Sequence, residues 1–165
     1  MKNSEYFLVR LIIIFGALLI GFFGSRIIGN LYYNRLMKEY APLADFKDHY
    51  ENQINRADDA YKVARLGMVF LKTDYSDLSL AAFRKATALD PKWRDGWVWL
   101  GYAELKNNPP AGGPQHALES LKTAEKIDPI YPLTYELLAT AYQLTGDEQS
   151  AKFAREKVTY LSKSK

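Results

Sequence analysis

The feature that most constrains the fold of this chain is an Asp-Pro pair that follows a helical segment and occurs twice. The pairs are Asp90-Pro91 and Asp128-Pro129. Proline has no backbone N–H and disfavours the helical conformation at the residue before it, so a helix that reaches Leu89 must end there. A new amphipathic helix is predicted after each pair, and after the first pair Asp95 is the expected capping residue. The chain is therefore predicted to form short helices separated by sharp turns.

Three helical segments carry the same pattern: a bulky residue, then leucine followed by a small residue, then an aromatic residue. The matching residues are Val63, Leu66, Gly67 and Phe70 in the first segment, Trp97, Leu100 and Gly101 in the second, and Tyr135, Leu138, Ala139 and Tyr142 in the third. The helix after each segment also matches, through Phe83 and Ala86, then Ala117, Leu121 and Ala124, then Ala151 and Val158. Two helices per unit, repeated at a period in the thirties, predict an all-α solenoid.

These residues resemble the tetratricopeptide repeat, a helix-turn-helix unit of about 34 residues. The three copies cover approximately residues 60–93, 94–131 and 132–165. The second copy has four additional residues in its turn, and the third has no closing proline. Glu104 and Arg155 occupy positions where the repeat has an aromatic residue. The resemblance covers roughly the last two-thirds of the chain and implies three stacked helix pairs in a domain over residues 58–165.

An apolar segment near the N-terminus predicts a membrane anchor. Leu11–Ser25 is an uncharged run of 15 residues. As a helix it spans about 22 Å, which is shorter than the roughly 30 Å hydrocarbon core of a bilayer. Arg10 and Arg26 can extend their charged groups to the membrane surface. The predicted transmembrane signal-anchor helix therefore covers residues 7–31 after a short tail over residues 1–6, which makes the chain a single-pass membrane protein.

A cleaved signal peptide is the alternative interpretation of this segment. Cleavage requires small residues at two positions shortly after the apolar run, and Phe22 or Phe23 occupies one of these positions for cleavage after Gly24 or Ser25. An uncleaved anchor is therefore favoured. The side of the membrane on which the repeats lie stays open, because two basic residues precede the apolar run and three follow it.

Small residues recur every four positions along one face of the predicted anchor. They are Ala17, Gly21, Ser25 and Gly29. Small residues at this spacing let two membrane helices approach closely, which predicts a packing seam for a homodimer or for another subunit of a membrane complex. The alternative is that glycine is simply frequent in membrane helices.

Residues 32–57 are predicted to connect the anchor to the repeats. The anchor helix is expected to continue to Tyr40 and to end before Pro42. Leu43, Phe46, Tyr50 and Ile54 then form a helical stripe. We interpret this second helix as a cap on the open apolar face of the first repeat, because the ends of a solenoid must be covered. The alternative is a mobile spacer.

The resemblance implies that the first helices of the repeats line a concave face that binds a protein or a peptide. Ten residues are predicted to line this groove: Tyr61, Arg65, Met68, Lys72, Trp99, Tyr102, Lys106, Glu136, Leu137 and Thr140. Ala64 and Val98 are predicted on the same face. An apolar strip beside three cations suits a peptide with apolar anchors and an acidic flank. The alternative is that three repeats curve little and partly bury these residues.

Two further features are candidates for contact with a partner. Phe153 and Tyr160 lie off the apolar face of the last predicted helix, so they predict a terminal contact patch for a partner or a second copy of the chain. The alternative is that they are scattered surface aromatics. The turn over residues 107–114 is rich in proline and glycine, and it is either a recognition loop or a tolerated insertion.

Composition excludes several function classes. The chain has no cysteine, so disulfides and zinc-thiolate sites are excluded. Five of the 22 basic and two of the 19 acidic residues precede residue 42, so the remaining 17 of each cancel and offer no basic surface for nucleic acid. His49 and His116 lack a second ligand at a metal-binding spacing, and no phosphate loop or catalytic triad is found. We expect no enzymatic activity, no metal and no cofactor.

The sequence thus predicts a membrane-tethered adaptor or scaffold that binds a protein or peptide partner through the concave face of its repeats. The alternative is an accessory or assembly subunit of a membrane protein complex, recognised mainly through its transmembrane helix. The identity of the partner, the pathway and the oligomeric state stay open.

Overall fold

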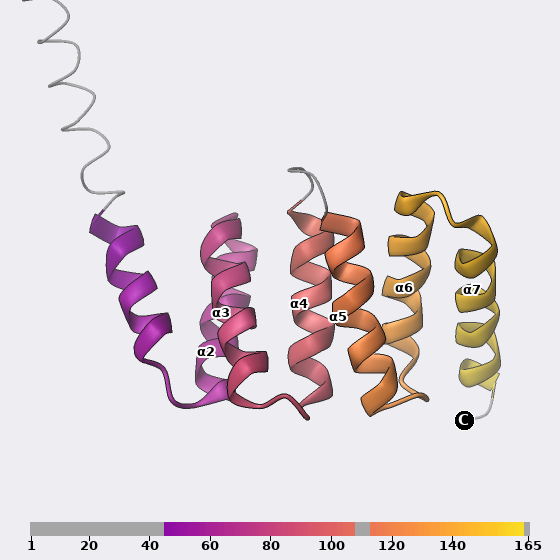
Figure 1. Ribbon diagram of the computed structural model, residues 1–165, viewed down its shortest axis with the longest axis horizontal. Helices are drawn as coiled ribbons and strands as arrows, with labels where there is room; N and C mark the ends of the chain where they lie inside the picture. Colours follow the sequence, from indigo (N-terminus) through magenta and orange to yellow (C-terminus); the bar gives the residue numbers. More distant parts are fainter. Residues whose placement is uncertain (1–44, 108–112, 164–165) are drawn as a thin grey trace, which may run out of the picture. The chain divides into compact units, whose positions relative to one another are not determined.

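Six helices form three successive pairs in the computed structural model, which describes residues 45–107 and 113–163. The first pair is α2 (Ala60–Lys72) and α3 (Ser76–Leu89), the second is α4 (Arg94–Lys106) and α5 (Gly113–Ile127), and the third is α6 (Pro132–Thr145) and α7 (Glu148–Lys163). All six belong to a compact unit over residues 48–165. The predicted all-α array of three helix pairs is confirmed (Figure 1).

The two Asp-Pro turns have the same construction. α3 ends at Leu89 as predicted, and the Asp90 carboxylate accepts a hydrogen bond from the Lys92 amide at 3.1 Å. The Asp128 carboxylate accepts one from the Ile130 amide at 3.2 Å. The predicted capping role of Asp95 is wrong: α4 begins at Arg94, no side chain caps it, and Asp95 lies in its first turn beside the Arg94 guanidinium.

An aromatic side chain ties the first helix of the second and third pairs to the turn before it. The indole N–H of Trp97 donates to the carbonyl oxygen of Pro91 at 2.9 Å. The hydroxyl of Tyr135 donates to the carbonyl oxygen of Pro129 at 2.8 Å. The bulky position of the repeat is thus held by a hydrogen bond as well as by packing, and two different aromatic residues make the same link.

Glycine lets the two helices of a pair approach closely. A Cβ atom added at Gly101 would lie 2.6 Å from Cγ of Leu121, and one at Gly67 would lie 3.0 Å from the ring of Phe83. Leu121 and Phe83 are both completely buried. The leucine-small pattern of the sequence is therefore explained by a bulky side chain of the second helix that fills the space above the small residue.

Contacts between successive pairs are partly polar. The guanidinium of Arg94 on α4 donates to the Asp128 carboxylate at 2.6 Å and lies 3.6 Å from the centre of the Tyr131 ring. Asp128 and Tyr131 belong to the turn that leads into α6. Arg94 therefore connects the second pair to the start of the third by an ion pair and a cation–π contact.

The first helices of the three pairs form one side of the unit, which we call the inner face. α4 contacts both α2 and α6, whereas no comparable contact joins α3 to α5 or α5 to α7 in the described part of the chain. Because the first helices approach one another more closely than the second helices do, the inner face is the concave side of the array. In Figure 1 the fainter α2 lies behind α3.

Glu104 on α4 occupies an aromatic position of the repeat and is buried, with only 6% of its surface exposed. The hydroxyl of Ser120 on α5 donates to its carboxylate at 2.8 Å, and the Arg84 guanidinium lies 3.9 Å away. Burial raises the pKa of the Glu104 carboxyl above its ordinary value, against the lowering effects of Ser120 and Arg84. A polar contact thus replaces the aromatic packing expected at this position.

A helical segment over the described residues 48–56 precedes α2 and packs against the first pair. Ile54 is buried, and the ring of Tyr50 meets the ring of Phe70 edge to face at 5.1 Å between centres. The Lys85 ammonium donates to the carbonyl oxygen of Asn55 at 3.0 Å. This segment therefore covers part of the apolar surface of α2.

No helix within residues 45–107 and 113–163 is long and apolar enough to cross a membrane. The predicted anchor over residues 7–31, with its seam of Ala17, Gly21, Ser25 and Gly29, lies outside the described residues. So does most of the turn over residues 107–114, because residues 108–112 are not described.

Candidate protein-interaction surfaces

The inner face carries a strip of partly exposed apolar side chains. Trp99 and Tyr102 on α4 lie edge to face, with ring centres 6.0 Å apart. Met68 on α2 and Leu137 on α6 are also partly exposed. The strip is therefore accessible on all three first helices, with two aromatic rings in its middle.

Three exposed cations accompany this strip. They are Arg65 and Lys72 on α2 and Lys106 at the end of α4. Lys72 and Lys106 lie in the last turns of their helices, where a positive charge is favourable against the helix dipole. None of the three cations forms an ion pair with a described residue, so their charges are available to an acidic partner.

The remaining predicted groove residues are exposed as well. The ring of Tyr61 packs against the ring of Trp93, with 5.9 Å between centres, which holds it at the start of α2. Glu136 and Thr140 are exposed on α6, and the Thr140 hydroxyl donates to the carbonyl oxygen of Glu136. These side chains lie at the margins of the strip.

Two residues predicted on the inner face are not available there. Ala64 and Val98 are only 3% and 1% exposed. Because α2 and α4 touch, residues that lie between neighbouring first helices are covered by those helices. The prediction that these two side chains are presented on the inner face is therefore wrong.

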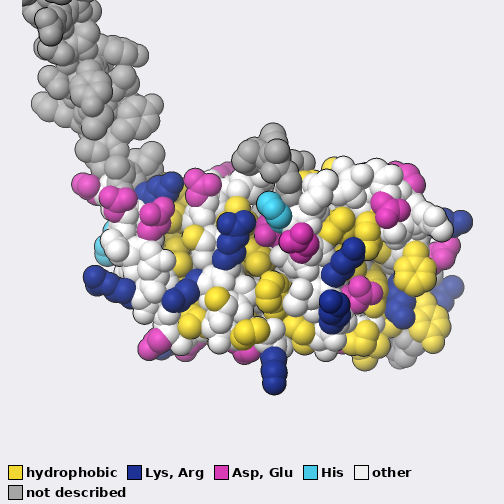
Figure 2. Space-filling view, in the orientation of Figure 1, with side chains coloured by type: hydrophobic (Ala, Val, Ile, Leu, Met, Phe, Trp, Pro, Cys, Tyr) yellow, Lys and Arg dark blue, Asp and Glu magenta, His cyan; other side chains and the backbone are white. Residues whose placement is uncertain are grey.

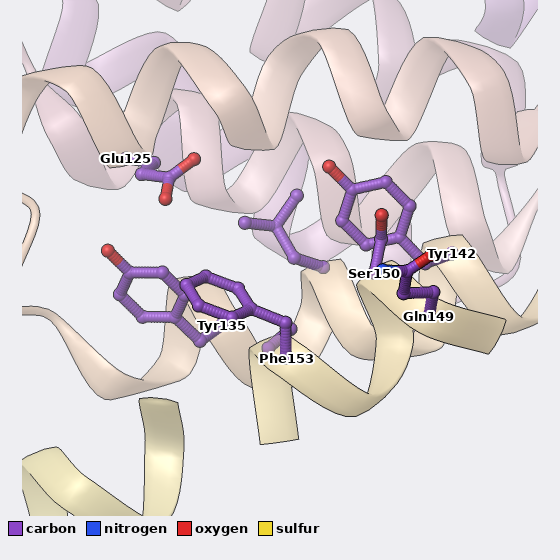
Figure 3. A pocket seen from close by; sticks show the side chains of 8 residues that line it. Glu125, Tyr135, Tyr142, Gln149, Ser150 and Phe153 are labelled. Atoms are coloured by element: carbon purple, nitrogen blue, oxygen red, sulfur yellow. The ribbon is translucent and has the colours of Figure 1, made fainter. Parts of the chain in front are cut away.

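A second surface feature, which sequence reasoning missed, is a hollow of about 300 Å³ between the last three helices. Its lining consists of Glu125 from α5, Tyr135, Leu138 and Tyr142 from α6, and Gln149, Ser150, Phe153 and Ala154 from α7. Leu138 and Ala154 are buried and form an apolar floor. Figure 3 shows the carboxylate of Glu125 on one side of the hollow and the rings of Tyr135, Phe153 and Tyr142 around the rest.

The electrostatics of this hollow are mixed. Burial raises the pKa of the Tyr135 phenol, and the neighbouring negative charge of Glu125 raises it further. Lys122 lies 5.5 Å from the centre of the Tyr142 ring, and Lys157 lies 5.8 Å from that of Tyr135. The hollow therefore has two lysines near its aromatic rings and one half-buried carboxylate, that of Glu125, in its lining.

The predicted terminal patch lies next to this hollow. Phe153 and Tyr160 are 66% and 68% exposed, and Phe153 also lines the hollow. Lys157 lies between them on α7, 5.9 Å from the centre of the Tyr160 ring. In Figure 2 hydrophobic side chains gather over the end of the unit where α7 lies. The two aromatics are thus part of a larger surface that α5 and α6 share.

Within residues 45–107 and 113–163, no three histidine or acidic side chains are grouped so that they could hold a metal ion. The ring of His49 instead shares a hydrogen bond with the side chain of Gln53 at 3.1 Å.

The tetratricopeptide repeat family matches residues 64–92, which span most of the first helix pair. MamA from MSR-1 has a similar structure, at 21% identity over 78% of this chain and 72% of that chain, with a TM-score of 0.59. A crystal structure of MamA aligns at 19% identity over 79% and 76% of the two chains, with a TM-score of 0.61.

A thermophilic TPR protein in Thermus thermophilus, TTC0263, is similar at 20% identity over 77% of this chain and 71% of that chain, with a TM-score of 0.57. No curated protein matches the chain. At such low identities the structural likeness shows the fold alone, and the match over residues 64–92 supports the same repeat.

Proposed function

We propose that this chain, which matches the tetratricopeptide repeat family over residues 64–92, is a scaffold that binds a protein or peptide on its inner face and holds it near a membrane. The apolar strip of the inner face carries this proposal. Its side chains are partly exposed on α2, α4 and α6, the first helices of the three pairs. The three cations beside it form no ion pair with a described residue. A segment with apolar anchors and acidic neighbours complements both features.

Trp99 and Tyr102 are the expected anchor sites for such a partner. Their rings lie in the middle of the strip, and buried aromatic residues near the centre of an interface carry much of its binding free energy. The cations are nearer its edges, where charges mainly accelerate association and select the partner. We therefore assign affinity to the two rings and charge selectivity to Arg65, Lys72 and Lys106.

The membrane part of the proposal rests on the sequence of residues 7–31. Confinement of the repeats to a bilayer raises the effective concentration of any partner that is also at the membrane. Modest affinity at the inner face is then sufficient for recruitment. We assign the small-residue seam of the anchor to packing with a second copy or with another membrane subunit.

The experiment that tests the proposal is recovery of partners with the full-length chain after chemical cross-linking in cells. We expect simultaneous Trp99→Ala and Tyr102→Ala substitutions to lower recovery about tenfold or more, because aromatic anchors each contribute roughly 2 kcal/mol. Ile130→Ala is the matched control, since Ile130 is exposed in a turn outside the inner face.

The alternative, recognition through the anchor, gives the opposite pattern in the same experiment. Gly21→Leu would then abolish recovery, whereas the double substitution at Trp99 and Tyr102 would leave it unchanged. That outcome would overturn the scaffold proposal and assign the chain to the accessory subunits of membrane complexes.

A further inference from the structure

The hollow between α5, α6 and α7 is lined by residues other than those of the inner face. It combines one carboxylate, from Glu125, with three aromatic rings, from Tyr135, Tyr142 and Phe153, above an apolar floor. It lies where the second pair meets the third. It therefore offers a binding site that is separate from the inner face.

Glu125 supplies the carboxylate among the residues that line the hollow. It lies beside the Tyr135 hydroxyl, whose single proton is donated to the carbonyl oxygen of Pro129 at 2.8 Å. Glu125 is half-buried and forms no ion pair with a described residue. Because the Tyr135 proton is donated to Pro129, a donor that enters the hollow can form a hydrogen bond with the Glu125 carboxylate.

The same chain already shows which side chain fits a carboxylate and a tyrosine ring together. Arg94 donates to Asp128 at 2.6 Å while its guanidinium lies 3.6 Å from the centre of the Tyr131 ring. A planar guanidinium can accept both contacts because it forks towards a carboxylate and stacks on an aromatic face. The hollow presents the carboxylate and the rings, but no arginine of the described chain occupies it.

We propose that this hollow binds an arginine side chain of a partner protein. The guanidinium would pair with Glu125 and stack on the exposed ring of Phe153, and the aliphatic part of the side chain would lie over the buried residues Tyr135, Leu138 and Ala154. The site is a second point of contact with a lining separate from that of the inner face, and its proposed ligand is a planar cation.

Two lysines of the chain itself weaken the attraction of the hollow for an arginine side chain. Lys122 and Lys157 lie 5.5 and 5.8 Å from the centres of the Tyr142 and Tyr135 rings, near the outer limit for a cation–π contact. Neither forms an ion pair with Glu125, and no such cation contact covers Phe153 in the described part of the chain. Their removal should therefore strengthen arginine binding, because each is a like charge near the guest.

The preceding junction between pairs provides an internal comparison. Counted from the Asp-Pro turn, Thr87 takes the place of Glu125. When the four additional residues in the turn of the second pair are left out of the count, Glu119 takes the place of Phe153 in the second helix of the pair. That junction therefore lacks the carboxylate at the first position and the aromatic ring at the second. The combination of groups is specific to the last junction rather than a general property of the repeats.

The test is a binding titration of the full-length protein by saturation-transfer NMR with short capped peptides. The two probes contain arginine or citrulline between alanines, since citrulline has the shape of arginine without its charge. We expect the arginine peptide to bind about tenfold more tightly than the citrulline peptide, as a charge-assisted hydrogen bond predicts. Equal binding of the two peptides overturns the proposal.

Three substitutions locate the binding. Glu125→Gln and Phe153→Ala should each weaken arginine binding, whereas Lys157→Met should strengthen it. Glu156→Gln is the matched control, because Glu156 is exposed on α7 and does not line the hollow. Phe153 is mostly exposed, so its truncation leaves the core intact. Unchanged arginine binding in Glu125→Gln also overturns the proposal.

Two further outcomes would show that the hollow binds an acidic segment, or that the arginine peptide binds the inner face. If Lys157→Met weakens binding and an aspartate-containing peptide competes, the hollow takes an acidic segment and the arginine assignment is wrong. The double substitution of Trp99 and Tyr102 by alanine should leave arginine binding unchanged. A loss in that variant would place the peptide on the inner face, which would refute the second site without refuting the proposed scaffold.

Discussion

At the scale of single residues, Glu104 shows how the fold tolerates a polar side chain in an aromatic position. Its carboxylate is buried between α4 and α5 and accepts a hydrogen bond from Ser120. Because burial raises its pKa, the folded protein binds a proton at Glu104 more readily than the unfolded chain does. Stability from this group is complete below the ordinary carboxyl pKa and is lost as the pH rises through the raised value.

Glu104→Gln should therefore stabilise the protein at pH 7. Glutamine keeps a hydrogen bond with Ser120 and removes the buried charge, so we expect the free energy of unfolding to rise by about 1 kcal/mol. The difference from the natural chain should disappear below about pH 4, where the glutamate is protonated. Urea denaturation of both proteins between pH 4 and pH 8 measures this, with the exposed Glu156→Gln as control. A pH-independent difference would contradict the explanation.

Sequence reasoning could identify Glu104 as unusual but could not find its partner. The departure from the repeat pattern is visible in the sequence, whereas Ser120 lies on the next helix after a turn with four additional residues. The approach of α5 to α4 also depends on Gly113, where a Cβ atom would lie 2.9 Å from the carbonyl oxygen of Glu104. Contacts of this kind are set by tertiary packing and have no local signal.

At the scale of helices, the bounds follow from local chemistry wherever a strong stop or cap is present. Pro91 ends α3, and the Asp59 side chain caps α2 by accepting a hydrogen bond from the Lys62 amide at 2.9 Å. Asp95 was wrongly predicted as the cap of α4 because an aspartate is favourable both at the cap position and in the first turn of a helix. The Asp95 carboxylate instead accepts a hydrogen bond from Arg94, which also pairs with Asp128 in the turn before α6.

The small residue of each pair sets how closely its helices pack. Gly101→Ala should lower the free energy of unfolding by about 1–3 kcal/mol, because the new methyl group would overlap the buried side chain of Leu121. Gly67→Ala should cost less, since its methyl group meets the flat ring of Phe83 at a longer distance and alanine favours the helix. Chemical denaturation of both variants checks the order, and an equal or reversed effect would refute this packing argument.

At the scale of the whole molecule, the order of three helix pairs could be predicted because each pair repeats the same pattern of side chains. The hollow could not be predicted from the sequence, because its lining comes from three helices between Glu125 and Ala154. Phe153 was recognisable as an aromatic residue off the apolar face. Tyr142 is explained by the repeat pattern and Glu125 belongs to no motif, so no sequence signal joins them to Phe153.

The proposed anchor can be tested in the full-length chain by membrane fractionation. Leu18→Arg places a charge in the middle of the apolar run and should shift the protein out of the membrane fraction, at a cost of about 2.5–3.5 kcal/mol for insertion. Leu36→Arg lies beyond the predicted anchor and should leave the distribution unchanged. Membrane association that persists equally in both variants would contradict the anchor. Because the chain has no cysteine, a maleimide probe on Ser164→Cys then reports which side the repeats face.

α6 carries residues of both surfaces, with Leu137 on the inner face and Leu138 at the floor of the hollow. A ligand that restricts α6 from one side would change the free-energy cost of restricting it from the other. By thermodynamic reciprocity, a partner on the inner face would then alter the affinity of the hollow by the same factor by which a ligand in the hollow alters the affinity of the inner face. Through α6 alone, binding at the inner face and binding in the hollow would then influence each other, although the two ligands do not touch.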